Sequence, residues 1–235
     1  MAEPNLTHVA QDYLKAVYHL GSSGKAVNTN DLAEALAVSP ATVTGMLKRL
    51  SKEGYLDYRP RQGAGLTAKG LQAALEVIRH HRLLETFFVS RLGMDWSQAH
   101  REAETLEHFI SEELEHLIDA AMGHPSQDPH GSPIPQPDGS IAEQECFSLA
   151  CVPAPASYVI RRVRAESPEL LDYLKRSNLV PGSVFELLAV EPFEGPLSLR
   201  LDGHVLHIGR KVGEAVFVQP LNGDTALSDD SNRSK

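Results

Sequence analysis

Residues 123–139 of this 235-residue chain read GHPSQDPHGSPIPQPDG, and they divide two regions with different hydrophobic periods. Before this segment, apolar residues recur every three or four positions, as on one face of an α-helix. After it, over residues 147–219, short runs alternate apolar and polar side chains between Gly and Pro, which is typical of an antiparallel sheet. Because proline disrupts helix interiors and central strands, the segment predicts a linker between a helical part and a β part.

The helical periodicity predicts five helices and one β-hairpin before the linker. Helices are expected over residues 5–20, 30–37, 39–53, 68–92 and 97–122. Ser39 is a preferred N-cap, and Pro40 suits the first helical position. The segments YLDYRP and GLTAKG predict two short strands. After the linker we expect a small antiparallel barrel with one short helix at 167–177, followed by a disordered tail from Leu221.

Charge is distributed unevenly, although the net charge of −9 argues against general nucleic-acid binding. Residues 1–70 carry 8 Lys and Arg against 6 Asp and Glu, whereas residues 71–125 carry 4 against 10 and six of the eleven histidines. No stretch approaches the ~20 apolar residues of a membrane span, and no signal-peptide pattern is present. Two cysteines, Cys146 and Cys151, cannot form a disulfide framework. We therefore expect a cytoplasmic protein without a membrane partner.

The segment DLAEALAVSPATVTGMLKRLSKEGYL has the pattern of a helix-turn-helix. Val43, Leu47 and Leu50 are predicted to face inward. Small, hydroxyl and basic side chains face outward, where they suit base edges and phosphates of DNA: Ser39, Ala41, Thr42, Thr44, Lys48 and Arg49. The following hairpin carries Arg59 and Arg61 and predicts a wing that contacts the DNA backbone or minor groove. A three-helix unit for protein contacts is the alternative.

Carboxylates and imidazoles cluster in HREAETLEH. His100, Glu104, Glu107 and His108 fall on one side of the predicted helix, and His81 and Glu85 form an i,i+4 pair on the preceding one. Such ligands without a nearby thiol suit Mn(II) or Fe(II), and less specifically Zn(II) or Co(II). The alternative is an ordinary solvated helix face, where these residue types are common.

Along the chain, the winged helix-turn-helix, the two ligand-bearing helices, the linker and the β part follow one another. This arrangement resembles the diphtheria toxin repressor family of metal-dependent regulators, most closely its manganese transport regulator branch. The resemblance covers about residues 5–220 and is carried by DYLKAVYHL, LAEALAVSPATVTGMLKRL, GLTAKG, HHRLLETFF, HREAETLEH and DPHGSPIP. It implies a mainly α fold with a C-terminal β domain. The implied parts are a winged helix-turn-helix over 1–70, a helical metal-binding and dimerisation domain with linker over 71–145, an SH3-like barrel over 146–220 and a disordered tail over 221–235.

The resemblance also implies two metal sites. The primary site corresponds to Asp12, Glu104, Glu107 and His108. The ancillary site corresponds to His81, Glu85 and His100, with Glu166 and Glu169 as the nearest matches for its ligands from the C-terminal domain. Iron-responsive relatives carry Met and Cys in place of Asp12 and Glu104, so the hard oxygen donors here favour Mn(II) over Fe(II). Lys15 stands where regulators with a two-metal cluster carry an acidic residue, and its charge disfavours a second ion.

The sequence therefore predicts a Mn(II)-activated repressor that binds palindromic operators of metal-uptake genes as a homodimer. An iron-responsive repressor of the same family is the first alternative. A di-metal oxidase is disfavoured because Glu113-x-x-His116 lacks a second Glu-x-x-His, so the prediction is that the chain is not an enzyme. A metal-independent winged-helix regulator or adaptor is the remaining alternative.

Overall fold

The computed structural model describes residues 6–21, 26–142, 144–164 and 167–221, and the chain divides into two compact units. The first unit comprises Met1–Gly93, Ala99–Ser126 and Ile134–Ala142. The second comprises Met94–Gln98, Gln127–Pro133 and Glu143–Lys235. Within the described residues, no helix has both the length and the apolar character needed to span a bilayer. The predicted disordered tail lies outside the described residues except for Leu221.

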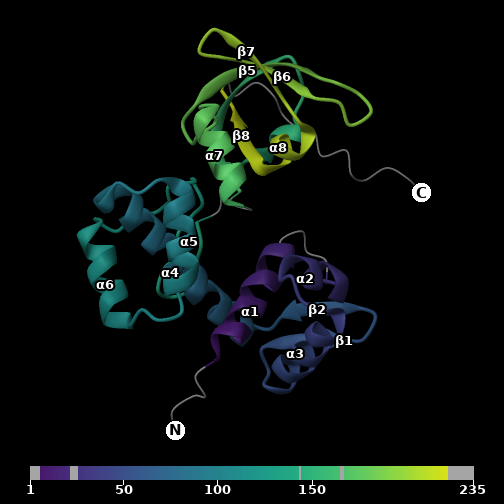
Figure 1. The fold of residues 1–235 in the computed structure, drawn as a ribbon, viewed down its shortest axis with the longest axis vertical. Helices are drawn as coiled ribbons and strands as arrows, with labels where there is room; N and C mark the ends of the chain where they lie inside the picture. The colour runs from purple at the N-terminus through teal and green to yellow at the C-terminus, as the bar shows by residue number, and fades with distance from the viewer. Residues whose placement is uncertain (1–5, 22–25, 143, 165–166, 222–235) are drawn as a thin grey trace. The chain divides into compact units, whose positions relative to one another are not determined.

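The first unit begins with three helices and a two-stranded hairpin (Figure 1). The elements are α1 (His8–Leu20), α2 (Thr29–Ala35), α3 (Pro40–Lys52), β1 (Leu56–Arg59) and β2 (Gly63–Leu66). Ser39 caps α3 as predicted, because its side chain accepts a hydrogen bond from the Thr42 amide and Pro40 follows it. The predicted inner residues Val43, Leu47 and Leu50 are all fully buried.

The predicted second strand, GLTAKG, is wrong in its C-terminal half. The strand β2 is GAGL, and α4 (Ala68–Leu92) begins directly after Thr67. The Thr67 hydroxyl caps α4 by accepting from the Gly70 amide, which gives the backbone a helical start where the alternating pattern suggested strand. A Cβ on Gly70 would lie 1.9 Å from the Tyr55 carbonyl oxygen, so only glycine allows the hairpin to pack this closely on α4.

The single helix predicted over 97–122 is also wrong, because the chain forms α5 (Trp96–Leu106) and α6 (Glu112–Ala121). Ser111 starts α6 by accepting a hydrogen bond from the Leu114 amide, and three glutamates in the first turn favour a helix N-terminus there. The break places Glu107 and His108 just beyond the end of α5.

Several apolar residues of α5, α6 and the turn between them are exposed, although the helical pattern predicted an inward stripe. The exposed fractions are 39% for Leu106, 65% for Phe109, 45% for Leu114 and 62% for Leu117. Exposed large apolar side chains mark a protein interface where they form one patch. The arrangement fits the dimerisation role that the family resemblance implies for this part of the chain.

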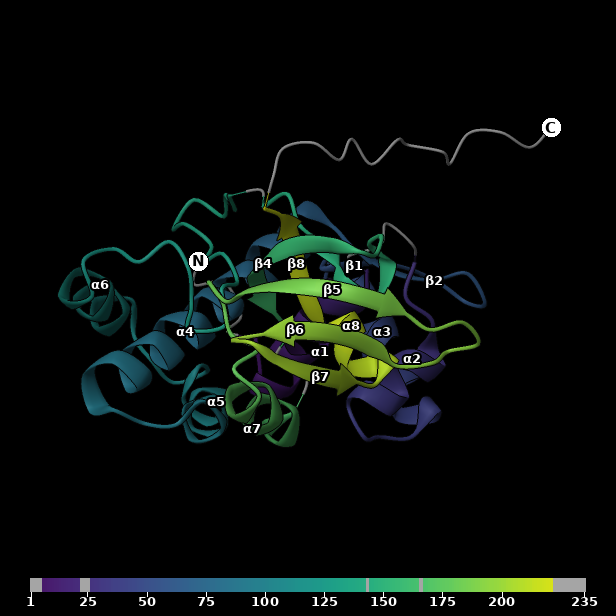
Figure 2. The same ribbon diagram turned by 90° about the horizontal axis from the view of Figure 1, so that it is seen from above.

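The second unit contains a six-stranded antiparallel sheet, in agreement with the predicted β domain (Figure 2). Its order is β3-β8-β4-β5-β6-β7, with β3 (Phe147–Ser148), β4 (Ala156–Val163), β5 (Val184–Val190), β6 (Leu197–Leu201), β7 (His204–Ile208) and β8 (Val216–Pro220). The predicted helix corresponds to α7 (Pro168–Arg176), capped by Ser167, and the sequence missed α8 (Arg210–Ala215). Asp202 and Gly203 both have positive φ and join β6 to β7 in a tight turn.

Candidate metal centre and DNA-binding surface

Asp12 on α1 and the residues that follow α5 meet within the first unit. The Nε2 atom of His108 lies 2.9 Å from Asp12 Oδ1 and 3.5 Å from Glu107 Oε1. One ligand atom from each of these residues lies within 4.8 Å of the others, and the Glu107 side chain is fully buried. Two carboxylates and one imidazole are hard to intermediate donors, which fit Mn(II) or Fe(II) better than a metal that prefers thiolates.

Gln11 and His8 support His108, and the sequence analysis missed both. The Oε1 atom of Gln11 lies 2.8 Å from His108 Nδ1, and with the ring proton on Nδ1 the Nε2 lone pair can bind a metal. The His8 ring stacks on the His108 ring with centroids 5.3 Å apart. Gln11 and Asp12 follow His8 by three and four positions, and Lys15 follows them by four and three, so these polar side chains share one face of α1.

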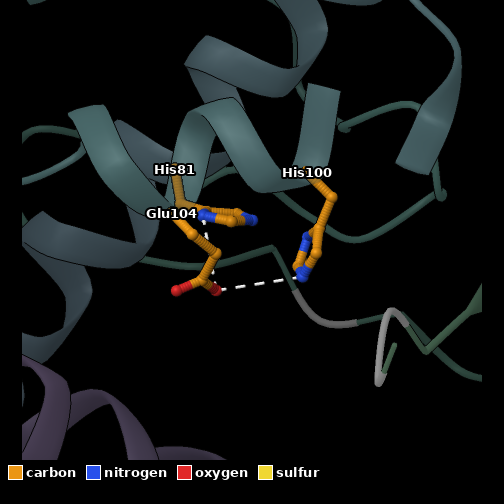
Figure 3. Close-up of side chains that lie close together, drawn as sticks. All are labelled: His81, His100 and Glu104. Atoms are coloured by element: carbon orange, nitrogen blue, oxygen red, sulfur yellow. Dashed lines mark ion pairs between the residues drawn. The ribbon is translucent and has the colours of Figure 1, made fainter. Parts of the chain in front are cut away.

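A second group of ligands is formed by His81 on α4 with His100 and Glu104 on α5. Figure 3 shows the Glu104 carboxylate facing both imidazoles, and its Oε1 lies 3.9 Å from His81 Nδ1 and 3.9 Å from His100 Nε2. The buried carboxylate of Glu85 holds both rings, at 3.0 Å from His81 Nε2 and 2.8 Å from His100 Nδ1. The structure thus places Glu104 with the predicted ancillary residues rather than with Asp12 and His108.

The two ligands predicted from the C-terminal domain belong to the second part of the chain. Glu169 lies in the first turn of α7 in the second unit, and Glu166 lies outside the described residues. Glu113 and His116, the basis of the di-metal oxidase alternative, are both exposed on α6.

Lys15 connects the two groups. Its ammonium lies 2.9 Å from Glu104 Oε1 and 2.7 Å from Glu107 Oε1. Burial alone raises the pKa of Glu104, but the Lys15 charge and the neighbouring histidines outweigh burial and hold this pKa below its ordinary value. Burial also raises the pKa of Asp12, and the charges of His108 and Lys15 only partly offset that rise. Lys15 thus stabilises the charged form of Glu104.

His80 on α4 contacts both the turn that follows α5 and the helix α6. Its Nδ1 lies 3.0 Å from the Glu107 carbonyl oxygen, and its Nε2 lies 3.0 Å from Glu115 Oε2 on α6. Glu115 in turn pairs with Arg79, which also contacts Asp119 and donates to the Pro135 carbonyl. This buried network holds the turn that carries Glu107 and His108.

In the metal-free protein, His81 is expected to carry a proton that a bound metal ion must displace. Burial lowers the pKa of His81, but the charge of Glu85 and hydrogen bonds with Glu107 and Glu85 outweigh it and raise the pKa to about 10. A raised pKa means that this proton stabilises the metal-free fold fully below pH ~6.5 and that the contribution is lost as pH rises through about 10. A histidine ligand must be neutral, so divalent metal binding at this group should release about one proton.

Calorimetry measures that proton directly. Titration with a divalent metal at pH 7.5, in buffers of different ionisation enthalpy, is expected to give about one more proton released per subunit for the wild type than for His81→Gln. Metal affinity at the His81 group should rise about tenfold per pH unit between pH 7 and 9. Equal proton release in the two proteins would show that His81 is not a ligand.

The outer face of α3 presents most of the predicted DNA-contacting residues. Lys48 and Arg49 are exposed, as are Ala41 and Thr42, and Gly45 has open space where a Cβ would stand. Thr44 differs from expectation, because its hydroxyl donates to the Pro40 carbonyl at 2.9 Å and is half-buried. Thr42 is more exposed than Thr44, and its hydroxyl also has a partner, the Ser39 hydroxyl at 2.8 Å.

The hairpin carries its two arginines outward. Arg59 has a side-chain exposure of 67% and lies 3.6 Å from Asp57, and Arg61 is exposed with a positive φ of 68° in the turn. Exposed guanidinium groups at the tip of a hairpin suit phosphate contacts.

Three protein-family models match the chain. The N-terminal DNA binding domain of iron dependent repressors matches residues 5–64, the metal binding and dimerisation domain of iron dependent repressors matches residues 67–136, and the FeoA domain matches residues 147–220. These descriptions agree with the helix-turn-helix, the ligand-bearing helices and the β-sheet, respectively.

Individual relatives agree with the models. The HTH-type transcriptional regulator MntR of Lysinibacillus sphaericus is 35% identical over 101 residues, which cover 43% of this chain and 72% of that protein. A solved manganese-dependent transcriptional repressor in complex with manganese has a TM-score of 0.84 and 34% identity, covering 90% of this chain and all of the other. A structure of ScaR with bound Zn2+ has a TM-score of 0.82 and 31% identity, covering 90% of this chain and 99% of that one.

Both the geometry and these similarities therefore assign the chain to the diphtheria toxin repressor family of metal-dependent transcriptional repressors, in its manganese transport regulator branch.

Proposed function

We propose that this chain represses metal-uptake genes by binding palindromic operators as a homodimer when Mn(II) is present. The observation that carries the proposal is the meeting of Asp12 on α1 with Glu107 and His108 beyond α5. This donor group takes one ligand from α1, in the DNA-binding part, and two ligands from the turn that follows α5, beside the exposed apolar residues. Hard oxygen donors favour Mn(II), and Fe(II) is the alternative ligand. No chemical step on a substrate is required of these residues.

Metal binding affects the position of the recognition helix α3 through α1. Asp12 lies on α1, which packs against both α2 and α3, and the bound ion would supply positive charge shared by Asp12, Glu107 and His108. Holding Asp12 near His108 fixes α1, and with it the recognition helix α3. In a dimer, this fixes both recognition helices for two half-sites. By linkage, DNA must then tighten metal binding by the same factor, typically about 5–150-fold.

The proposed partners follow from this mechanism. Exposed Leu106, Phe109, Leu114 and Leu117 supply the surface for a second copy, and α3 with the hairpin supplies the surface for duplex DNA. A repressor acts where the chromosome is, so we place the chain in the cytoplasm.

Selection from a random duplex DNA pool tests the proposal. The selection is run with Mn(II), with Fe(II) under anaerobic conditions and with chelator. Palindromes enriched with Mn(II) and absent with chelator are expected. Enrichment only with Fe(II) would identify an iron sensor. Equal enrichment with chelator would contradict the metal switch and leave a metal-independent winged-helix regulator.

A further inference from the structure

A β-bulge in β4 turns arginine side chains to the outer face of the sheet, where β4 lies beside β8 (Figure 2). Ile160 of β4 pairs with Val218 of β8, but the next pair is Arg162 with Phe217. Arg161 is therefore the extra residue of the bulge. Ile160 and Val218 are fully buried, and successive residues of β8 face opposite sides of the sheet. Phe217 and its partner Arg162 thus face outward, whereas regular alternation would turn Arg162 to the buried side with Ile160.

The ring of Phe217 holds two guanidinium groups on this outer face. The guanidinium carbon of Arg162 lies 4.4 Å from the ring centroid, and that of Arg164 lies 5.3 Å from it. Stacking uses the flat face of a guanidinium group and leaves the N–H groups at its edge directed outward for hydrogen bonds with an anion. Arg161 is exposed beside them, and its Nε donates to Gln219 Oε1 at 2.8 Å. These three arginines form one positively charged surface, here called the arginine face.

The charge of Arg162 is not neutralised by a carboxylate. Two other arginines of the second unit have such partners, since Arg200 pairs with Glu186 and Arg210 lies 3.9 Å from Glu214. Within the part of the chain that the structure describes, no carboxylate lies within ion-pair distance of Arg162. A half-buried guanidinium group that is held by an aromatic ring and has no carboxylate partner suits an anion from outside the chain.

We propose that the arginine face binds phosphate groups of duplex DNA outside the operator half-sites. The proposal rests on the proposed function, because it takes the operator duplex as the ligand. Guanidinium groups bind phosphate oxygens through paired hydrogen bonds, and such contacts carry no sequence information. Residues 126–235 carry 15 Asp and Glu against 10 Lys and Arg, so most of this part of the chain repels DNA. The arginine face offsets that repulsion locally.

The salt dependence of binding to two duplexes tests the proposal. One duplex is the selected operator alone, and the other extends it by about 20 base pairs on each side, which adds phosphates beyond the half-sites. Each phosphate contact contributes about 0.9 to the slope of log affinity against log salt concentration. Raising the salt from about 50 to about 200 mM with Mn(II) present should weaken binding of the wild type to the long duplex about 100-fold more than binding of the double variant Arg162→Gln with Arg164→Gln. On the short duplex the two proteins should respond equally, as measured by fluorescence anisotropy.

Three further variants separate charge from folding. Arg162→Lys with Arg164→Lys keeps both charges and should retain most of the salt dependence of the wild type. Arg200→Gln with Arg210→Gln makes the same charge change at arginines that have carboxylate partners, and the salt dependence should stay that of the wild type. Arg161→Gln alone should reduce the salt effect on the long duplex by about tenfold, and this readout applies even if the glutamine double variant does not fold.

The outcomes distinguish this inference from the proposed function. Equal salt dependence of the wild type, Arg161→Gln and the glutamine double variant on the long duplex would overturn the inference. The same reduction in Arg200→Gln with Arg210→Gln would also overturn it, because the effect would then be one of net charge. A reduction of equal size on the short duplex would place the contacts within the operator and contradict the assignment to flanking DNA. A wild type that binds neither duplex in a Mn(II)-dependent way would overturn the proposed function instead.

Discussion

Replacing His108 with alanine is expected to abolish metal-induced DNA binding and to weaken Mn(II) binding at its group by more than about 100-fold. His108 supplies the nitrogen donor of the group that it forms with Asp12 and Glu107. Loss of a residue that merely orients a ligand already costs about 10–100-fold in metal affinity, so loss of the ligand itself should cost more. The measurements are Mn(II) titration by calorimetry and fluorescence anisotropy with the selected operator.

Two other variants serve as comparisons for His108→Ala, one with a smaller expected loss and one with none. Gln11→Leu removes the hydrogen bond to His108 Nδ1 and should cost about 10–100-fold in Mn(II) affinity, with residual metal-dependent DNA binding. His204→Ala removes an exposed histidine of β7 and should leave both properties unchanged. A His108→Ala protein with the full Mn(II) response would refute the assignment and shift the switch to the His81 group.

Replacing Arg79 with alanine is expected to lower the free energy of unfolding of the metal-free protein by about 3–5 kcal/mol, the usual cost of breaking a buried ion pair. Arg79 is 4% exposed and joins α4 to α6 through Glu115 and Asp119, at 2.5 and 3.0 Å. Without the guanidinium, two carboxylates remain close together with little access to water. Urea denaturation followed by far-ultraviolet circular dichroism measures the loss.

The matched variants for Arg79 test whether the uncompensated charge is the cause. Arg79→Met combined with Glu115→Gln and Asp119→Asn should be less destabilised than Arg79→Ala alone, since no buried charge is left unpaired. Arg101→Ala, at an exposed position of α5, should stay within about 0.5 kcal/mol of the wild type. A loss below about 1 kcal/mol in Arg79→Ala would show that water or neighbouring residues satisfy the network.

The DNA-binding part could be predicted from local sequence because its elements are specified locally. Ser39 and Pro40 mark the start of α3, and the inward positions Val43, Leu47 and Leu50 follow from helical spacing. The same reasoning failed over 97–122, where the apolar spacing continues across Ser111. There Ser111 begins a new helix as its N-cap, and much of the apolar spacing is exposed, so burial does not favour one continuous helix.

For the ligand groups too, the sequence predicted some features and the structure was needed for others. Sequence spacing identified Glu104, Glu107 and His108 as neighbours and, with the family resemblance, added Asp12, which lies far away along the chain. The resemblance groups Glu104 with Asp12, Glu107 and His108, and spacing on one helix does not give the direction of each side chain. The structure groups Glu104 with His81 and His100, and it places Lys15 between that group and Glu107.

The sequence by itself determined the helical and β parts, the helix caps and the residue types available as ligands, because periodicity and capping act over a few residues. Only the tertiary structure decided which carboxylates share a cation. That choice depends on how α1 packs against α4 and where α5 ends, and both are set by contacts between residues distant in the chain. Lys15 and Glu107 are 92 positions apart, yet their ion pair defines the centre of the site.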